Sequence, residues 1–80
     1  MSWNIYILRC ADDTLYTGIC KDLRRRLEQH NQAIGAKYTR GRAPVTLLYS
    51  ETQPDRASAT RREWEIKNLS RTEKLALAKA

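Results

Sequence analysis

The chain has 80 residues, of which 41% are hydrophobic and 30% are charged, and its formal net charge is +6. This length supports one hydrophobic core, so we expect a single domain over residues 1–80. The composition excludes a disordered chain, and no apolar run reaches the roughly 20 residues that span a membrane. The excess of basic groups favours a polyanionic partner, nucleic acid before an anionic membrane.

Cys10 and Cys20 are the only cysteines, and the chain has one histidine. Two thiols and one imidazole are too few for a zinc site or a disulfide framework. We therefore expect two buried thiols in a reducing cytosol. The start of the chain has no charge before its apolar stretch and no small-residue cleavage site, so we expect no secretory signal and a cytoplasmic protein.

Two strands are predicted first. Residues 3–10 and 15–20 are rich in aromatic and β-branched residues, and the turn residues "ADDT" between them favour a β-hairpin. With the turn centred near Asp13, Tyr6 would lie opposite residue 20 and Tyr16 opposite residue 10, with both phenols on one face of the sheet. Gly18 inside the second strand indicates a bulge or a close backbone approach.

Asp22 suits the N-cap of a helix that runs to about residue 33 and ends at Gly35. The basic segment 35–44 is expected to form a loop that closes at Pro44.

Residues 45–51 predict a third strand, and a second helix follows over roughly 55–69. Ser70 and Glu73 match a capping box, which begins a short third helix. The order β-β-α-β-α-α predicts an α+β fold in which helices flank a three-stranded antiparallel sheet.

The apolar residues of the first helix recur at spacings of four and seven and form its buried stripe: Leu23, Leu27 and Ile34. A turn of about 100° per residue places His30 within this stripe and Arg26 at its edge, one helical turn away. His30 is therefore either an ordinary core residue or a functional group paired with Arg26. Arg24 and Arg25 point elsewhere, as solvated or phosphate-attracting charges.

The second helix carries an acidic residue among its inward-facing positions, which are Ala59, Glu63, Ile66 and Ser70. Trp64 projects away from this stripe and is expected to cover another face. Burying the Glu63 carboxylate alone would cost several kcal/mol, so it needs a cationic partner. That partner is Arg62, another arginine or a metal ion.

Five positions occur in an order and at separations that resemble the GIY-YIG nuclease superfamily. They are the triplet Asn4-Ile5-Tyr6, the triplet Tyr16-Thr17-Gly18, and Arg26, His30 and Glu63. The likeness to the small single-domain bacterial branch covers essentially the whole chain, including "YILRC", "LYTGI", "DLRRRLEQHN" and "GAKYTRGRAPVTLLY". Asn replaces Gly in the first triplet and Thr replaces Ile in the second, while both tyrosines and Gly18 are retained.

This resemblance implies a metal-dependent endonuclease that hydrolyses phosphodiester bonds in DNA, with RNA as another substrate to consider, and that acts on branched, nicked or flap structures in repair or recombination. It implies that Glu63 binds one Mg²⁺ or Mn²⁺ ion and that Arg26 stabilises charge on the scissile phosphate. Tyr6 is implied as the general base and Tyr16 as a group that positions water or phosphate. A tyrosine with an ordinary pKa of about 10 is a poor base, so Tyr6 needs help from Arg26, the metal or a neutral His30.

One residue of the family pattern is missing. Several branches carry an asparagine a turn or more beyond the metal-binding glutamate, and Asn68 comes too early to match it. With no separate DNA-binding domain in these 80 residues, basic and aromatic groups must supply phosphate contacts that do not read sequence. The expected contacts are Arg24, Arg25, Lys37, Tyr38, Arg40, Arg42, Arg61 and Arg62.

Two other functions stay open. The missing asparagine favours a non-catalytic nucleic-acid-binding module that retains the GIY-YIG fold. An exposed tryptophan, either Trp3 or Trp64, would instead favour a protein-interaction domain in which the indole is the anchor.

Overall fold

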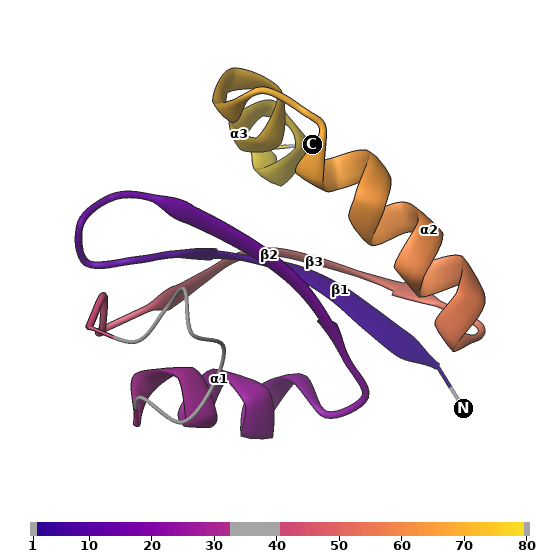
Figure 1. Cartoon of the computed structure of the whole chain (residues 1–80), viewed down its shortest axis with the longest axis horizontal. Helices are drawn as coiled ribbons and strands as arrows, with labels where there is room; N and C mark the ends of the chain where they lie inside the picture. The colour runs from indigo at the N-terminus through magenta and orange to yellow at the C-terminus, as the bar shows by residue number, and fades with distance from the viewer. Residues whose placement is uncertain (1, 33–40, 80) are drawn as a thin grey trace.

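The computed structural model describes residues 2–32 and 41–79. Its elements are β1 (Trp3–Arg9), β2 (Leu15–Cys20), α1 (Leu23–Asn31), β3 (Thr46–Gln53), α2 (Arg56–Lys67) and α3 (Arg71–Lys79). The strands form an antiparallel sheet in the order β2-β1-β3 (Figure 1). The predicted α+β fold is confirmed, and the third strand lies one to two residues further along the chain than expected. The predicted end of the first helix and most of the basic loop lie outside the described residues.

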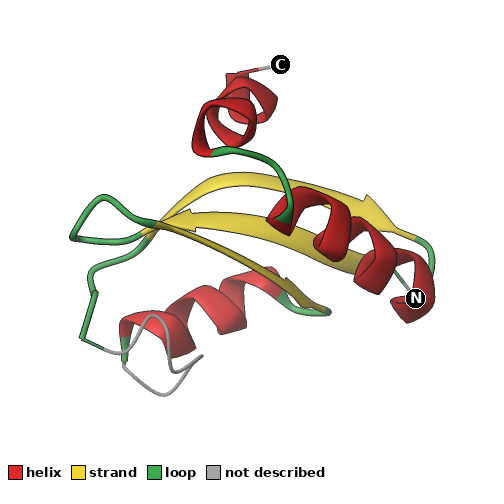
Figure 2. Ribbon diagram, turned by 45° about the horizontal axis from the view of Figure 1, so that its top comes forward, coloured by secondary structure: helices red, strands yellow, loops and turns green. Residues whose placement is uncertain are grey.

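Helices cover both faces of the sheet. α1 lies on one face, and α2 and α3 lie on the other (Figures 1 and 2). The central strand β1 contributes side chains to both faces of the sheet, because successive side chains of a strand point to opposite faces. Ile5 and Ile7 cluster with Ala59 and Ile66 of α2. On the other face, Tyr6 belongs to a second cluster against which α1 packs. The phenol of Tyr6 is therefore held between the sheet and α1.

The hairpin register differs from the prediction by two residues. Tyr6 pairs with Gly18 and Tyr16 pairs with Leu8. The N–H of Cys10 donates to the carbonyl of Thr14 at 2.9 Å, so the turn is centred on residue 12 rather than 13. Two residues are one full side-chain period of a strand, and both phenols therefore stay on the same face, as predicted.

All three helices begin where their capping residues indicate. Asp22 and Asp55 each accept a hydrogen bond from the backbone N–H three residues later, at 3.1 and 2.7 Å. Ser70 and Glu73 form the predicted capping box, in which each side chain bonds the other residue's backbone N–H, at 3.1 and 2.9 Å. These local bonds explain why the helix starts could be predicted from sequence.

Two compositional expectations can be compared with the structure. Cys10 and Cys20 are buried free thiols, as predicted. Within the described ranges, no helix combines the length and the apolar character that crossing a bilayer requires.

Candidate active site

Four of the five predicted catalytic residues meet between the sheet and α1. The hydroxyl of Tyr6 lies 3.0 Å from Nε2 of His30, and Nε of Arg26 donates to the same hydroxyl at 3.4 Å. The ring of Tyr16 lies 6.3 Å from that of Tyr6 and 5.3 Å from that of His30, between centroids. Residues separated by 24 positions in the sequence therefore share one hydrogen-bonded cluster.

Gly18 leaves the space that this cluster needs. A Cβ at this position would lie 2.6 Å from Oη and 2.8 Å from Cζ of Tyr6. It would also lie 3.1 Å from Cε2 of Tyr16. The β1–β2 register is continuous here, so Gly18 marks a close approach and not a bulge. The group that approaches is the phenol of its cross-strand partner.

Burial sets the protonation of the Tyr6–His30 pair. Burial raises the pKa of Tyr6 to about 12, against the opposing hydrogen bond from Arg26. Burial and, secondarily, the positive charge of Arg26 lower the pKa of His30 below its ordinary value. At neutral pH the phenol is therefore protonated and the imidazole is neutral. Tyr6 accepts from Arg26 and can donate its own proton to Nε2 of His30.

Gln29 completes the surroundings of Arg26 and was not predicted. Its side-chain Oε1 accepts a hydrogen bond from Nη1 of Arg26 at 3.1 Å. Tyr6 and Gln29 thus hold two different nitrogens of one half-buried guanidinium. The spacing of three residues on one helix face was the available signal.

Glu63 stands apart from these four residues. It lies on α2, which covers the other face of the sheet, and 20% of its side chain is exposed. The cationic side chain it meets is Lys67, with Nζ 3.4 Å from Oε2, and not Arg62 or another arginine, which were two of the predicted partners. Its burial is thus only partial, and the inward stripe is shorter than expected, because Ser70 is exposed and caps α3.

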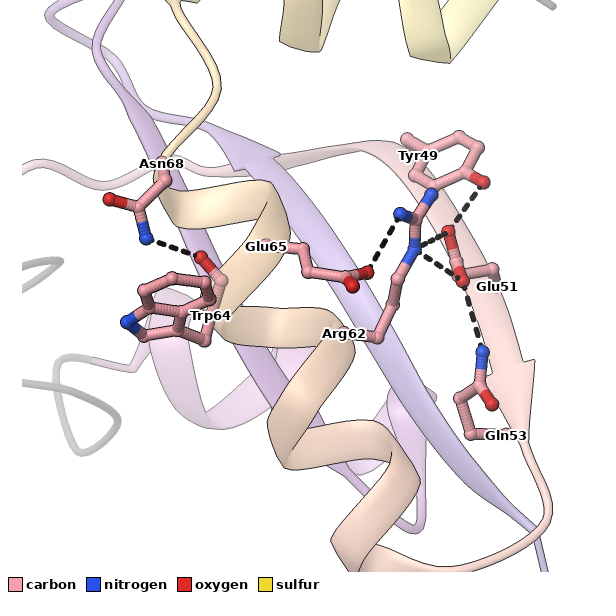
Figure 3. Close-up of polar contacts among 7 residues, drawn as sticks. All are labelled: Tyr49, Glu51, Gln53, Arg62, Trp64, Glu65 and Asn68. Carbon is pink, nitrogen blue, oxygen red and sulfur yellow. Dashed lines mark hydrogen bonds and ion pairs between the residues drawn. The ribbon is translucent and has the colours of Figure 1, made fainter.

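Arg62 is turned toward β3 instead. Its Nε donates to both carboxylate oxygens of Glu51, at 3.1 and 3.0 Å, and its Nη1 donates to Glu65 at 3.2 Å (Figure 3). At about 100° per residue, Arg62 and Glu63 lie on opposite sides of the line joining the buried Ala59 and Ile66. Glu63 therefore lies on the flank of α2 that is turned away from β3, toward the edge strand β2.

The side chains available as ligands decide which metal ion this chain could hold. The described residues contain no group of three or more His, Cys, Asp or Glu side chains that could hold a metal. A site on this chain would therefore depend on one carboxylate, which suits Mg²⁺, since this ion keeps several waters and takes other ligands from substrate phosphate. Glu63 fits as a partly exposed hard oxygen donor, and an ion pair with a half-exposed lysine is weak enough to be displaced.

The basic and aromatic groups predicted to contact nucleic acid divide into three sets. Lys37, Tyr38 and Arg40 lie outside the described residues. Arg24, Arg25 and Arg61 are exposed. Arg42 is bonded to Asp12 at 2.9 Å, and Arg62 is half-buried and committed to acidic partners. Arg62 is therefore removed from the proposed contact surface.

Two more features were not predicted from sequence. A cavity of about 210 Å³ is lined by Thr14, Leu15, Arg71 and Lys74, none of them a candidate catalytic residue. Thr17 pairs with Ile7 on the face that α2 covers, and its buried hydroxyl has no hydrogen-bond partner in the described part of the chain. Trp64 projects away from the inward stripe, as predicted, but the expectation that it covers another face was wrong, because 67% of its surface is exposed.

Comparison with known proteins identifies the class of this domain. A family model described as the GIY-YIG catalytic domain matches residues 2–76. The chain therefore belongs to the GIY-YIG family, a family of nuclease domains, as its motifs predicted.

The chain is also similar to curated proteins and to solved structures. The chain is 54% identical over 80 residues to a UPF0213 protein of Desulfotalea psychrophila, covering 99% of this chain and 73% of the relative. It is 50% identical over 74 residues to a UPF0213 protein of Halobacterium salinarum, covering 92% and 96%. The solution NMR structure of a UPF0213 protein from Bacillus halodurans is 43% identical, with a TM-score of 0.62 and coverage of 99% and 84%. That of an E. faecalis protein is 38% identical, with a TM-score of 0.67 and the same coverage.

Proposed function

We propose that this protein is a metal-dependent endonuclease that hydrolyses phosphodiester bonds in DNA, with structure-selective cleavage in repair or recombination and with RNA as the second substrate to test. The observation that carries the proposal is the convergence of His30 and Arg26 on the hydroxyl of Tyr6 in a chain of the GIY-YIG family. Packing of a hydrophobic core does not require a guanidinium and an imidazole at the hydroxyl of one tyrosine.

Arg26 is the proposed phosphate-binding group. Its guanidinium has five N–H donors, of which Tyr6 and Gln29 engage two. The others can meet the oxygens of a phosphodiester, and two fixed contacts hold the fork in place before substrate arrives. A preorganised cation of this kind stabilises the charge that develops on the phosphate during attack.

Tyr6 and His30 are the proposed proton acceptors. A phenol with a pKa of about 12 is costly to ionise, so a free phenolate is a poor candidate for the base. Instead, a water proton can pass to Oη of Tyr6 while the phenol's own proton passes to Nε2 of His30, 3.0 Å away. The proton ends on the imidazole and hydroxide attacks the phosphorus. The bond from phosphorus to the leaving sugar oxygen breaks, and that oxygen takes a proton from water. Tyr16, the more exposed phenol, positions the water or the phosphate.

Glu63 is the residue proposed to hold one Mg²⁺ or Mn²⁺ ion, which when bound would supply positive charge at the phosphate and an acidified water. β2 is an edge strand, with Tyr16 on one of its faces and the Glu63 flank of α2 toward the other. We therefore place the substrate along this edge, where both faces of the sheet are within reach.

The test is cleavage of end-labelled duplex, flap and junction DNA in Mg²⁺ or Mn²⁺. The wild-type protein should cut and Glu63→Gln should not. Glu65→Gln is the matched control, because this carboxylate lies on the same helix two residues later and is more exposed. Equal cleavage by the wild type and Glu63→Gln, insensitive to EDTA, would contradict the proposal.

A second candidate is a nucleic-acid-binding module without catalysis. Asn68 favours it, because this residue caps α2 by donating to the carbonyl of Trp64 at 2.7 Å and so does not supply the missing asparagine (Figure 3). This alternative predicts no cleavage and unchanged affinity in Glu63→Gln. Arg25→Gln should then weaken binding and reduce its salt dependence.

A further inference from the structure

Trp64 is the most exposed of the large hydrophobic side chains that the structure describes. Its exposed fraction is 67%, compared with 42% for Leu47 on β3. Its backbone carbonyl accepts a hydrogen bond from the side chain of Asn68 (Figure 3), while its indole has no hydrogen-bond partner among the described residues. Exposing an indole to this extent forgoes the stabilisation that burial provides. The packing of the domain gives no reason for a tryptophan here.

The immediate neighbours of Trp64 on the helix surface are polar. At spacings of three and four residues they are Thr60, Arg61, Lys67 and Asn68, and all four are exposed. A protein-binding anchor is ordinarily part of an apolar patch, which this helix face lacks. An aromatic ring flanked by cations is instead the arrangement on which nucleobases stack while their phosphates are neutralised.

The position of Trp64 relates it to the proposed metal ligand. It follows Glu63 directly, so the two side chains differ by about 100° around α2. Figure 3 shows Trp64 and Arg62 on opposite sides of the helix, with Arg62 at β3. Trp64 therefore lies on the outward face of α2, on the side turned away from β3 and next to the flank that carries Glu63, beside which the proposed substrate passes.

We propose that Trp64 is a base-stacking residue that selects nucleic acid with an unpaired base beside the cleaved ester. This rests on the proposed function for its substrate class. Bases inside a duplex are already stacked, and they must be unpaired before a side chain can cover their faces. An indole that projects from a convex helix surface can therefore use its stacking energy only on a single strand, a flap or a gap.

The test measures binding without catalysis. In EDTA and low salt, fluorescence anisotropy compares a labelled oligo-dT strand with a blunt duplex. Trp64→Ala should weaken binding of the single strand about 5- to 150-fold, the range expected for one stacked base, and leave duplex binding unchanged. Trp64→Phe should retain most of the affinity. Leu47→Ala is the matched control, since it removes the other exposed apolar side chain from a different surface and should change neither affinity.

A second readout does not depend on a variant at position 64. In a Trp3→Phe background Trp64 is the only indole, and its fluorescence should be quenched as oligo-dT is added, since stacking brings the ring against a base. Absence of quenching, or equal loss of single-strand and duplex affinity in Trp64→Ala, would overturn the proposal. So would self-association in sedimentation that Trp64→Ala abolishes while single-strand affinity is unchanged. Stacking without any cleavage by the wild type would contradict the nuclease proposal alone.

Discussion

Tyr6 and Gly18 lie directly opposite each other on β1 and β2, and the glycine leaves the volume that the phenol occupies. Any Cβ at position 18 would lie 2.6 Å from the Tyr6 hydroxyl, closer than real Cβ atoms approach. That hydroxyl is also the point where His30 and Arg26 meet. A missing side chain on one strand therefore determines the geometry of the candidate active site.

Gly18→Ala should consequently reduce both stability and activity. The added methyl group forces the ring of Tyr6 out of its rotamer, and overpacking of this kind costs about 1–3 kcal/mol. Urea unfolding measures the change, and cleavage rates should fall further than the loss of folded protein explains. In a Tyr6→Leu background, which removes the ring that is displaced, Gly18→Ala should cost much less. The same cost in both backgrounds would show that the phenol is not the obstacle.

Thr17→Val should stabilise the protein. The hydroxyl of Thr17 is buried on the α2 face and has no described partner, and an unsatisfied group of this kind costs about 1–3 kcal/mol. Valine has the same shape without the hydroxyl, so thermal unfolding should shift upward by about 4–8 °C per kcal/mol gained. Thr52→Val on β3 is the control, because this threonine is exposed and should give no comparable gain. A lower unfolding temperature in Thr17→Val would indicate that the hydroxyl has a partner.

Stability should depend on pH through His30, the only histidine in the chain. Burial lowers its folded pKa, so between that value and its unfolded value of about 6.5 the unfolded chain binds more protons. The free energy of unfolding is therefore fully retained above the unfolded pKa and decreases as pH falls below it toward the lowered folded pKa. Among the described residues, Tyr6, Tyr16 and Arg26 face the imidazole.

Urea unfolding measured across the range from neutral to mildly acidic pH tests this expectation. In His30→Gln the pH dependence in that range should flatten, whatever the absolute stability of the variant. Carboxylates with lowered pKa values change the free energy of unfolding only at lower pH, because the ordinary pKa values of Asp and Glu are 3.8 and 4.5. An unchanged slope in His30→Gln would contradict the assignment.

Glu51 should matter more to stability than Glu65, although both bind Arg62. The Glu51 side chain is 18% exposed and that of Glu65 is 50% exposed. Burial opposes the charge of Glu51, but hydrogen bonds from Arg62 and Tyr49 outweigh it and lower its pKa. Its contribution is therefore present above the unfolded value and is lost as pH falls through the lowered folded value.

Glu51→Gln should cost about 1.5–3 kcal/mol, the range for hydrogen bonds to charged groups, and Glu65→Gln should cost clearly less. Chemical unfolding at neutral pH measures both. Equal costs would mean that the contact between α2 and β3 contributes no more than a surface ion pair.

Features that depend on neighbours in the sequence were predicted correctly. Asp22 and the Ser70–Glu73 pair bond backbone groups three residues away, so their spacing alone indicates where the first and third helices start. The shared face of Tyr6 and Tyr16 was also predictable, because a register shift of two residues leaves every side chain on the same face of the sheet.

Contacts between elements were not predictable in the same way. Helical periodicity placed Glu63 near the inward stripe but could not indicate that Arg62 would bond to Glu51, a residue on β3 that only the packing of α2 brings within reach.

The sequence by itself determined the elements, their order and the residue types available for chemistry, because short-range spacing controls helix caps and strand faces. Tertiary structure decided which of those residues meet. Only the closure of α1 onto the sheet brings His30 and Arg26 to one phenol, and only burial there raises the pKa of Tyr6 to about 12 and keeps the imidazole neutral. Desolvation and long-range contacts are properties of the packed chain, and no local pattern encodes them.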